Sequence, residues 1–168
     1  MRKLIGIVFA VLFLMAMVTP TYAQKLGYVD LGKLFDEYNK TKDYDKALEA
    51  KQMAYESERQ SKVNEVKQLQ DKIDLLSDKE KEAKKKELED KIKALQEFDR
   101  DKQQDLRRER DEKMREILKD IESAISEYAK SQNYTLVFND RVLVYQDKSL
   151  DITDKVLEIL QKKYPAKK

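Results

Sequence analysis

The sequence predicts a mainly α-helical protein in which a long antiparallel helical hairpin projects from a small body of short strands. Three observations predict this class. Residues 42–130 contain no glycine and no proline, and charged residues and glutamine dominate there, which favours helix. Apolar residues in that segment recur at three- and four-residue steps, the spacing of paired helices. Short segments with strand composition flank the helical segment.

The first part of the body is expected within residues 24–41. Leu26 to Asp30, read Leu-Gly-Tyr-Val-Asp, has the composition of a short strand. Asp30 is then a good N-cap for a short helix. That helix carries one apolar stripe, at steps of three and four residues, formed by Leu31, Leu34, Phe35 and Tyr38.

The arm is expected to span residues 42–130 as two helices rather than one. A single helix of this length would measure about 130 Å at 1.5 Å per residue. A turn is expected near Ser77 and Asp78, because Ser77 is a good N-cap and Glu80 completes a capping box. The tip of the arm is therefore placed near residues 77–80, and each helix would extend about 50 Å from the body.

The fold-back is supported by the residues on either side of position 79. If the chain folds back at position 79, Val66 lies opposite Ile92 on the other helix. Two blocks without apolar residues, 56–62 and 99–105, then lie beside each other at the same distance from the tip. Because an apolar seam is missing there, we expect the arm to bend more easily at that level, with weaker protection against hydrogen exchange.

The second part of the body is expected within residues 131–168. Tyr134–Phe138 and Arg141–Tyr145 are rich in β-forming residues and flank Asn139 and Asp140, which predicts a β-hairpin with a two-residue turn. Asp151 then caps a final helix that carries apolar residues up to Leu160 and ends before Pro165.

The predicted β-hairpin would have two apolar faces, whereas a half-exposed hairpin alternates apolar with polar residues. Three short strands make a marginal core alone, so we expect several copies to bury their hairpins together in a closed cyclic oligomer. A monomer whose first and last helices cover the two faces is the alternative. The expected oligomer core consists of Tyr28, Val29, Leu34, Phe35, Leu136, Val137, Phe138, Val142, Leu143 and Val144.

Residues 1–23 have the pattern of a secretory signal peptide. Arg2 and Lys3 precede an apolar run from Leu4 to Val18, and small residues precede an expected cleavage after about Ala23. The run is about 15 residues long, short of the roughly 20 that span a bilayer. The alternative is an uncleaved N-terminal anchor. Cleavage would leave one domain, residues 24–168, outside the inner membrane.

The composition excludes several classes of chemistry. Histidine and cysteine are absent, which removes disulfides, thiol chemistry, histidine metal sites and Ser-His-Asp catalysis. No glycine-rich phosphate loop can be built from Gly27 and Gly32. Without the leader the chain carries 33 basic and 33 acidic residues, so the basic excess typical of nucleic-acid binding is missing. We therefore expect no cofactor, no metal, no nucleic-acid partner and no enzymatic activity.

The order of these segments resembles the Skp (OmpH) family of periplasmic chaperones. The strongest parts are the opening from Leu26 to Phe35, the segment from Tyr134 to Tyr145, and Asp151 to Leu157. The low-complexity helical middle adds little specificity. The resemblance covers nearly all of the chain after residue 24.

The resemblance implies a periplasmic homotrimer with a β-centred body and three helical arms around a cavity. It also implies an ATP-independent holding chaperone that binds unfolded outer-membrane β-barrel proteins and prevents their aggregation before membrane insertion. The better-known members are markedly basic, whereas this chain is balanced after cleavage. That departure weakens any inference of electrostatic capture of acidic clients or lipopolysaccharide.

Client contacts would come from apolar and aromatic residues near the base of the arm and along it. Methionine adapts to varied surfaces, which suits a binder of many partners. Each of these residues could equally serve to pack the two helices together. The candidates are Tyr44, Leu48, Met53, Tyr55, Phe98, Leu106 and Met114.

A basic run, Lys84, Lys85 and Lys86, lies close to the predicted tip. It could touch anionic lipid or acidic client segments, or it could be an ordinary solvated helix end. A structural coiled-coil spacer or adaptor between envelope components is the alternative function for the whole chain. A spacer would require an uninterrupted apolar seam and an anchor, and neither is expected after cleavage.

Overall fold

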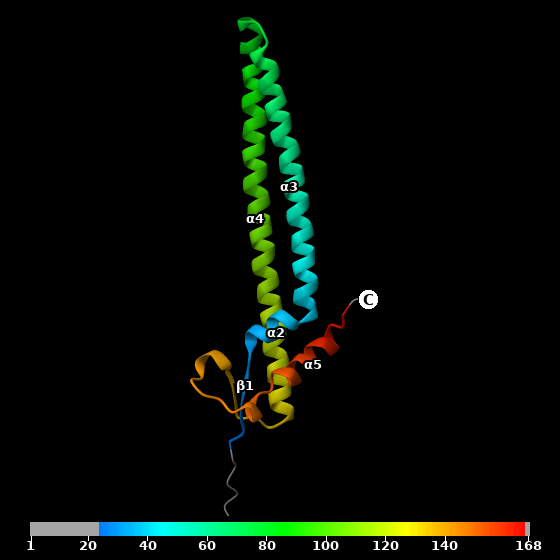
Figure 1. Cartoon of the computed structure of the whole chain (residues 1–168), viewed down its shortest axis with the longest axis vertical. Helices are drawn as coiled ribbons and strands as arrows, with labels where there is room; N and C mark the ends of the chain where they lie inside the picture. The colour runs from blue at the N-terminus through cyan, green and yellow to red at the C-terminus, as the bar shows by residue number, and fades with distance from the viewer. Residues whose placement is uncertain (1–23, 167–168) are drawn as a thin grey trace, which may run out of the picture.

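The computed structural model describes residues 24–166, so the predicted signal peptide lies outside the described residues. The chain is mainly helical, with a two-stranded sheet and two long helices that project from a small body (Figure 1). Among the described helices, none combines the length and the apolar character that crossing a bilayer requires.

The arm is formed by α3 (Asn39–Asp74) and α4 (Asp78–Ser131), which run side by side in opposite directions (Figure 1). The predicted turn is present, and Ser77 is the N-cap of α4. Its backbone N–H donates to Glu80 Oε2 at 3.2 Å, as the predicted capping box requires. The predicted reflection about position 79 is also observed, because Arg59 pairs with Asp99 and Glu65 pairs with Lys91 across the arm.

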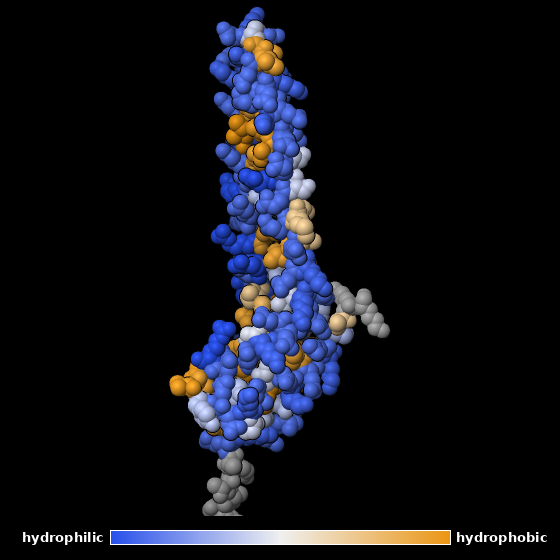
Figure 2. All heavy atoms as spheres, in the orientation of Figure 1, coloured by the Kyte–Doolittle hydropathy of each residue, from blue (hydrophilic) through white to orange (hydrophobic). Residues whose placement is uncertain are grey.

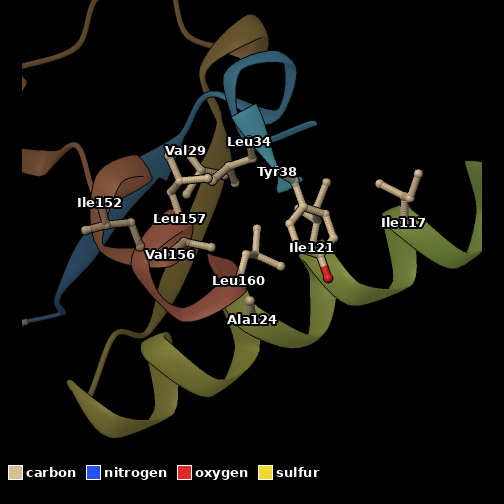
Figure 3. Close-up of a cluster of buried hydrophobic side chains, with 10 residues drawn as sticks. All are labelled: Val29, Leu34, Tyr38, Ile117, Ile121, Ala124, Ile152, Val156, Leu157 and Leu160. Atoms are coloured by element: carbon tan, nitrogen blue, oxygen red, sulfur yellow. The ribbon is translucent and has the colours of Figure 1, made fainter. Parts of the chain in front are cut away.

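The body contains a hydrophobic core built within a single chain. It lies between β1 (Leu26–Val29), α2 (Leu31–Glu37), the last turns of α4 and α5 (Thr153–Lys163) (Figure 3). Burying these side chains stabilises the body by about 1.5–3 kcal/mol for each large aliphatic residue. The buried cluster consists of Val29, Leu34, Tyr38, Ile117, Ile121, Ala124, Ile152, Val156, Leu157 and Leu160.

The sheet differs from the predicted β-hairpin. β2 (Leu136–Asn139) pairs with β1 in parallel, with Leu26 opposite Leu136 and Tyr28 opposite Phe138. The predicted second hairpin strand, residues 141–145, is instead a 3₁₀ turn, Asp140–Val142, followed by an extended loop. A second 3₁₀ turn, Lys148–Leu150, leads to α5. The hairpin prediction is therefore wrong for the single chain.

The physical reason for this difference lies at the turn. The Asn139 side chain accepts a hydrogen bond from the Arg141 backbone N–H at 3.3 Å, and the Leu143 N–H donates to the Asp140 carbonyl at 3.0 Å. These bonds close a 3₁₀ turn rather than the tight two-residue turn of a hairpin. β1 meanwhile supplies a strand partner, and the entry to β2 is fixed by the Thr135 N–H donating to the Lys25 carbonyl at 2.8 Å.

The expected oligomer-core residues divide into two groups. Tyr28, Val29 and Leu34 are buried within one chain, so their burial requires no second copy. Phe35 and Val137 pack partly buried against the same core, and Leu143 is half-buried. The remaining four expected residues are exposed in the single chain, namely Leu136, Phe138, Val142 and Val144.

Candidate functional site

A groove of about 1090 Å³ lies between α3 and α4, in the half of the arm nearer the body. Three of the predicted client contacts, Leu48, Tyr55 and Leu106, line this groove. They come from both helices because the antiparallel register brings residues near 50 opposite residues near 106. The other lining residues are Asp45, Glu49, Gln52, Glu56, Arg59, Asp99, Gln103, Arg107, Arg110 and Asp111.

Tyr55 is the aromatic residue that lines the groove, and it packs on Phe98 beside it. Tyr55 is only 7% exposed and stacks at a tilt on Phe98, with ring centroids 5.8 Å apart. The Lys62 ammonium lies 4.9 Å from the Phe98 ring centroid, a favourable cation–π arrangement. Both aromatic candidates therefore pack the two helices together, and the Tyr55 ring also lines the groove.

A polar cluster closes the upper end of the groove, where the sequence lacks an apolar seam. We call Tyr55, Arg59, Asp99 and Gln103 the mid-arm cluster. Asp99 accepts hydrogen bonds from the Tyr55 hydroxyl at 3.2 Å and from Arg59 Nε at 3.1 Å, while Gln103 Nε2 lies 3.4 Å from the Tyr55 hydroxyl. The hydrogen bond and charge of Asp99 raise the pKa of Arg59. These bonds tie α3 to α4 at this level.

The rim of the groove carries charges of both signs. Arg107 and Arg110 lie on the α4 side, and Asp45, Glu49 and Glu56 lie on the α3 side. Because arginine combines a planar cation with an apolar stem, it can cover apolar or aromatic groups while it remains solvated. The groove can therefore accept apolar side chains on its floor and polar backbone at its edges.

The other predicted contacts lie outside the groove. Met53 is 60% exposed on α3, and Met114 is exposed on α4, one turn before the exposed Leu118. Tyr44 packs against the core of the body at the base of α3, and burial raises its pKa. Figure 2 shows the arm as a mainly hydrophilic surface that is interrupted by separate hydrophobic patches at several levels.

The predicted basic patch at the tip is largely paired with acidic neighbours on the same helix. Lys84 pairs with Glu87, and Lys85 pairs with Glu82 at 2.8 Å. Lys86 is exposed on the same face of α4 as Asp90. The tip also exposes Leu75, at the end of α3. Within residues 24–166, no group of three or more acidic side chains is arranged to hold a metal ion.

Sequence reasoning missed the mid-arm cluster as a unit. Arg59, Asp99 and Gln103 lie in the blocks that have no apolar residues, where charges usually form a solvated helix face. A signal was nevertheless present, because reflection about position 79 places Arg59 directly opposite Asp99. Opposite charges at matching levels of two antiparallel helices predict a cross-arm ion pair.

The fold and the groove together define a class of protein. It is a helical-hairpin arm protein, in which two long helices hold an elongated contact surface away from a small body (Figure 1). The chain belongs to the OmpH-like family, because the family described as "Outer membrane protein (OmpH-like)" matches residues 25–160. The family resemblance predicted from the sequence is therefore confirmed.

Among solved structures, the chain is similar to a candidate outer membrane chaperone (OmpH-like) from Caulobacter crescentus CB15. The TM-score is 0.78 at 13% sequence identity, and the match covers 87% of this chain and 89% of that chain. At this identity the similarity shows a shared fold. Among curated proteins, no sequence matches this chain significantly.

Proposed function

We propose that this protein is an ATP-independent holding chaperone of the periplasm. It binds unfolded outer-membrane β-barrel proteins between helical arms and keeps them from aggregating before membrane insertion. The observation that carries the proposal is the arm itself, a polar two-helix rod with a groove lined by Leu48, Tyr55 and Leu106 and with exposed methionines. Membership in the OmpH-like family supports the same function.

The chemistry of the arm suits weak and repeated contact with an unfolded chain. An unfolded β-barrel protein exposes alternating apolar residues and unpaired strand edges, both of which are prone to aggregation. Met53 and Met114 supply adaptable apolar contacts, and the charged surface around them keeps the arm soluble. Each contact is weak, so the client leaves when folding in the membrane lowers its free energy further.

Assembly into a homotrimer makes these weak contacts effective. The loop after β2 protrudes from the body (Figure 1), and Val142 is 69% exposed, Tyr145 is 84% exposed and Val144 is fully exposed. A contiguous exposed apolar segment of this kind is typical of a protein interface. Three copies joined there would place three arms around one client, which raises the effective concentration of every contact.

The proposed location follows from the predicted leader, which would direct the chain across the inner membrane and be removed after about Ala23. Contact with anionic lipid at the arm tip would be weak, because Lys84 and Lys85 are already paired with acidic side chains. No reaction is proposed, and the mid-arm cluster holds α3 and α4 together.

Dilution of a urea-denatured outer-membrane β-barrel protein into buffer tests this function. With residues 24–168 present, light scattering should fall strongly, and native mass spectrometry should find one client bound to three chains. A double variant, Met53→Glu and Met114→Glu, should suppress scattering less. The matched control, Ser57→Glu and Gln104→Glu, adds the same two negative charges at exposed polar positions of the arm. Unchanged scattering with the unmodified protein would reject the holding function.

A further inference from the structure

The two helices of the arm are attached to the body in different ways. α4 is continuous with the body, because Ile117, Ile121 and Ala124 lie within the hydrophobic core (Figure 3). α3 follows α2 after a single extended residue, Tyr38, and none of its residues belongs to the buried cluster, although Tyr44 packs against that cluster. The arm therefore stands on one embedded helix and on one helix that side chains must hold in place.

Three side chains, those of Tyr38, Asn39 and Lys40, make four bonds that hold the start of α3, and we call these four bonds the root latch. Lys40 Nζ bonds Glu116 at 2.7 Å and Asp120 at 2.6 Å, both on α4. The Tyr38 hydroxyl donates to the same Asp120 carboxylate at 3.2 Å. Directly after α5, the Tyr164 carbonyl accepts a hydrogen bond from the Asn39 side chain at 3.2 Å.

Tyr164 reinforces the latch through its ring and hydroxyl. The ring meets Tyr38 edge to face, with centroids 6.2 Å apart, and the hydroxyl donates to Asp43 at 3.1 Å. Burial, together with the Asp120 charge, raises the pKa of Tyr38 to about 12. Burial alone would lower the pKa of Lys40, but its hydrogen bonds to Asp120 and Glu116 outweigh burial and raise it.

Bending an arm made of two helices that lie side by side requires one helix to slide along the other. For helix axes about 9 Å apart, a bend of about 10° in their common plane requires about 1.6 Å of sliding. The loop at residues 75–77 joins the helices at the tip, so the sliding must be taken up elsewhere. A shift of this size exceeds the range of about 0.5 Å over which an N–H···O hydrogen bond keeps good geometry, so hydrogen bonds between the helices at the base of the arm would have to break.

We propose that the root latch sets the stiffness of the arm, because it prevents α3 from sliding along α4 where the arm meets the body. Opening the latch would let the arm bend in the plane of its two helices. On an arm of about 50 Å, a 10° bend displaces the tip by about 9 Å. If the protein holds clients between its arms as proposed, bending of the arms would let the space between them fit larger clients. The effect of the root latch on arm stiffness does not depend on that function.

Distance measurements between spin labels test the latch. The chain has no cysteine, so Lys86→Cys near the tip and Gln161→Cys on α5 provide unique attachment sites at exposed positions. Labelled chains are mixed with excess unlabelled chains, so that only distances within one copy are read. No client is present, and the result is therefore independent of holding activity.

Lys40→Met removes the cation and retains most of the length of the unbranched side chain. It should broaden the distance distribution by several ångström, since the tip moves about 9 Å for each 10° of bend. Lys42→Met is the matched control, because Lys42 lies in the same turn and is exposed. Its distribution should superimpose on that of the unmodified chain.

The distance distributions can be compared only if both variants fold. Circular dichroism should show the same helical content in both variants. If Lys40→Met does not fold, the isosteric pair Glu116→Gln and Asp120→Asn, which removes both anionic partners, should produce the broadening instead. A folded latch variant with an unchanged distribution would overturn the proposal.

Discussion

The mid-arm cluster allows one prediction to be developed in detail, the effect of Tyr55→Phe. This change removes a single hydroxyl, which donates to Asp99 at 3.2 Å and lies 3.4 Å from Gln103 Nε2. The ring remains and can still pack on Phe98. The substitution therefore tests the polar connection across the arm while it preserves the apolar contact.

The magnitude follows from what the hydroxyl contacts. A hydrogen bond to a charged group contributes about 1.5–3 kcal/mol. Arg59 still pairs with Asp99 after the change, so the Asp99 carboxylate keeps a hydrogen-bond partner. We therefore expect a loss of stability at the lower end of this range. A loss of about 1.5 kcal/mol corresponds to roughly a tenfold increase in the population of the locally open arm.

Hydrogen exchange followed by mass spectrometry measures that population. Protection should fall about tenfold in peptides that cover residues 52–62 and 96–106, and it should remain unchanged in α5. Ser57→Ala is the control, because it also removes one hydroxyl at this level of the arm, and Ser57 is exposed; surface changes usually stay within about 0.5 kcal/mol. Equal protection in Tyr55→Phe and in the unmodified chain would refute a stabilising role for the cluster. Hydrogen exchange in the unmodified chain also tests the expectation that the arm bends most easily at this level. Protection equal to that of residues 66–76 and 88–95 would contradict it.

Three further predictions concern the body and the arm root. Leu160→Ala removes a fully buried side chain of α5 and should lower the free energy of unfolding by about 2–5 kcal/mol, as chemical denaturation can measure. Val144→Asp places a charge in the exposed apolar segment, so sedimentation equilibrium should show the proposed trimer for the unmodified chain and a shift toward monomer for the variant; equal assembly of both chains would contradict the proposed interface. Hydrogen bonds from Lys113 and Lys40 lower the pKa of Glu116 from 4.5 to about 2, so its stabilising contribution is complete above pH 4.5 and is lost as the pH falls toward 2. Glu116→Gln should therefore be less stable than the unmodified chain at pH 7, and the difference should vanish near pH 2; a difference independent of pH would contradict this.

The arm could be predicted closely because its determinants are local. A segment without glycine or proline and with strong helix formers has one favourable backbone conformation. The capping box at Ser77 and Glu80 then marks where the second helix begins. Both features depend on residues within a few positions of one another, so they can be recognised without knowledge of the rest of the fold.

The sheet could not be predicted in the same way. The composition of 134–145 favours strand, but it does not specify which strand will pair with it. β2 pairs with β1, more than a hundred residues away in the chain, and the Asn139 side chain closes a 3₁₀ turn where a hairpin turn was expected. The distant pairing is fixed by contacts such as the Thr135 N–H donating to the Lys25 carbonyl, which join segments far apart in the chain.

The sequence alone was sufficient to predict the helical arm, its turning point and the family to which the chain belongs. Helix propensity and capping depend on residues a few positions apart, and the order of the segments can be read along the chain. Only the tertiary structure decided that one chain builds its own core, that Tyr55, Arg59 and Asp99 tie the arm at mid-length, and that Lys40 and Tyr164 hold its root. These contacts join residues from 40 to more than 120 positions apart. Their free energy depends on geometry that exists only once the helices have packed.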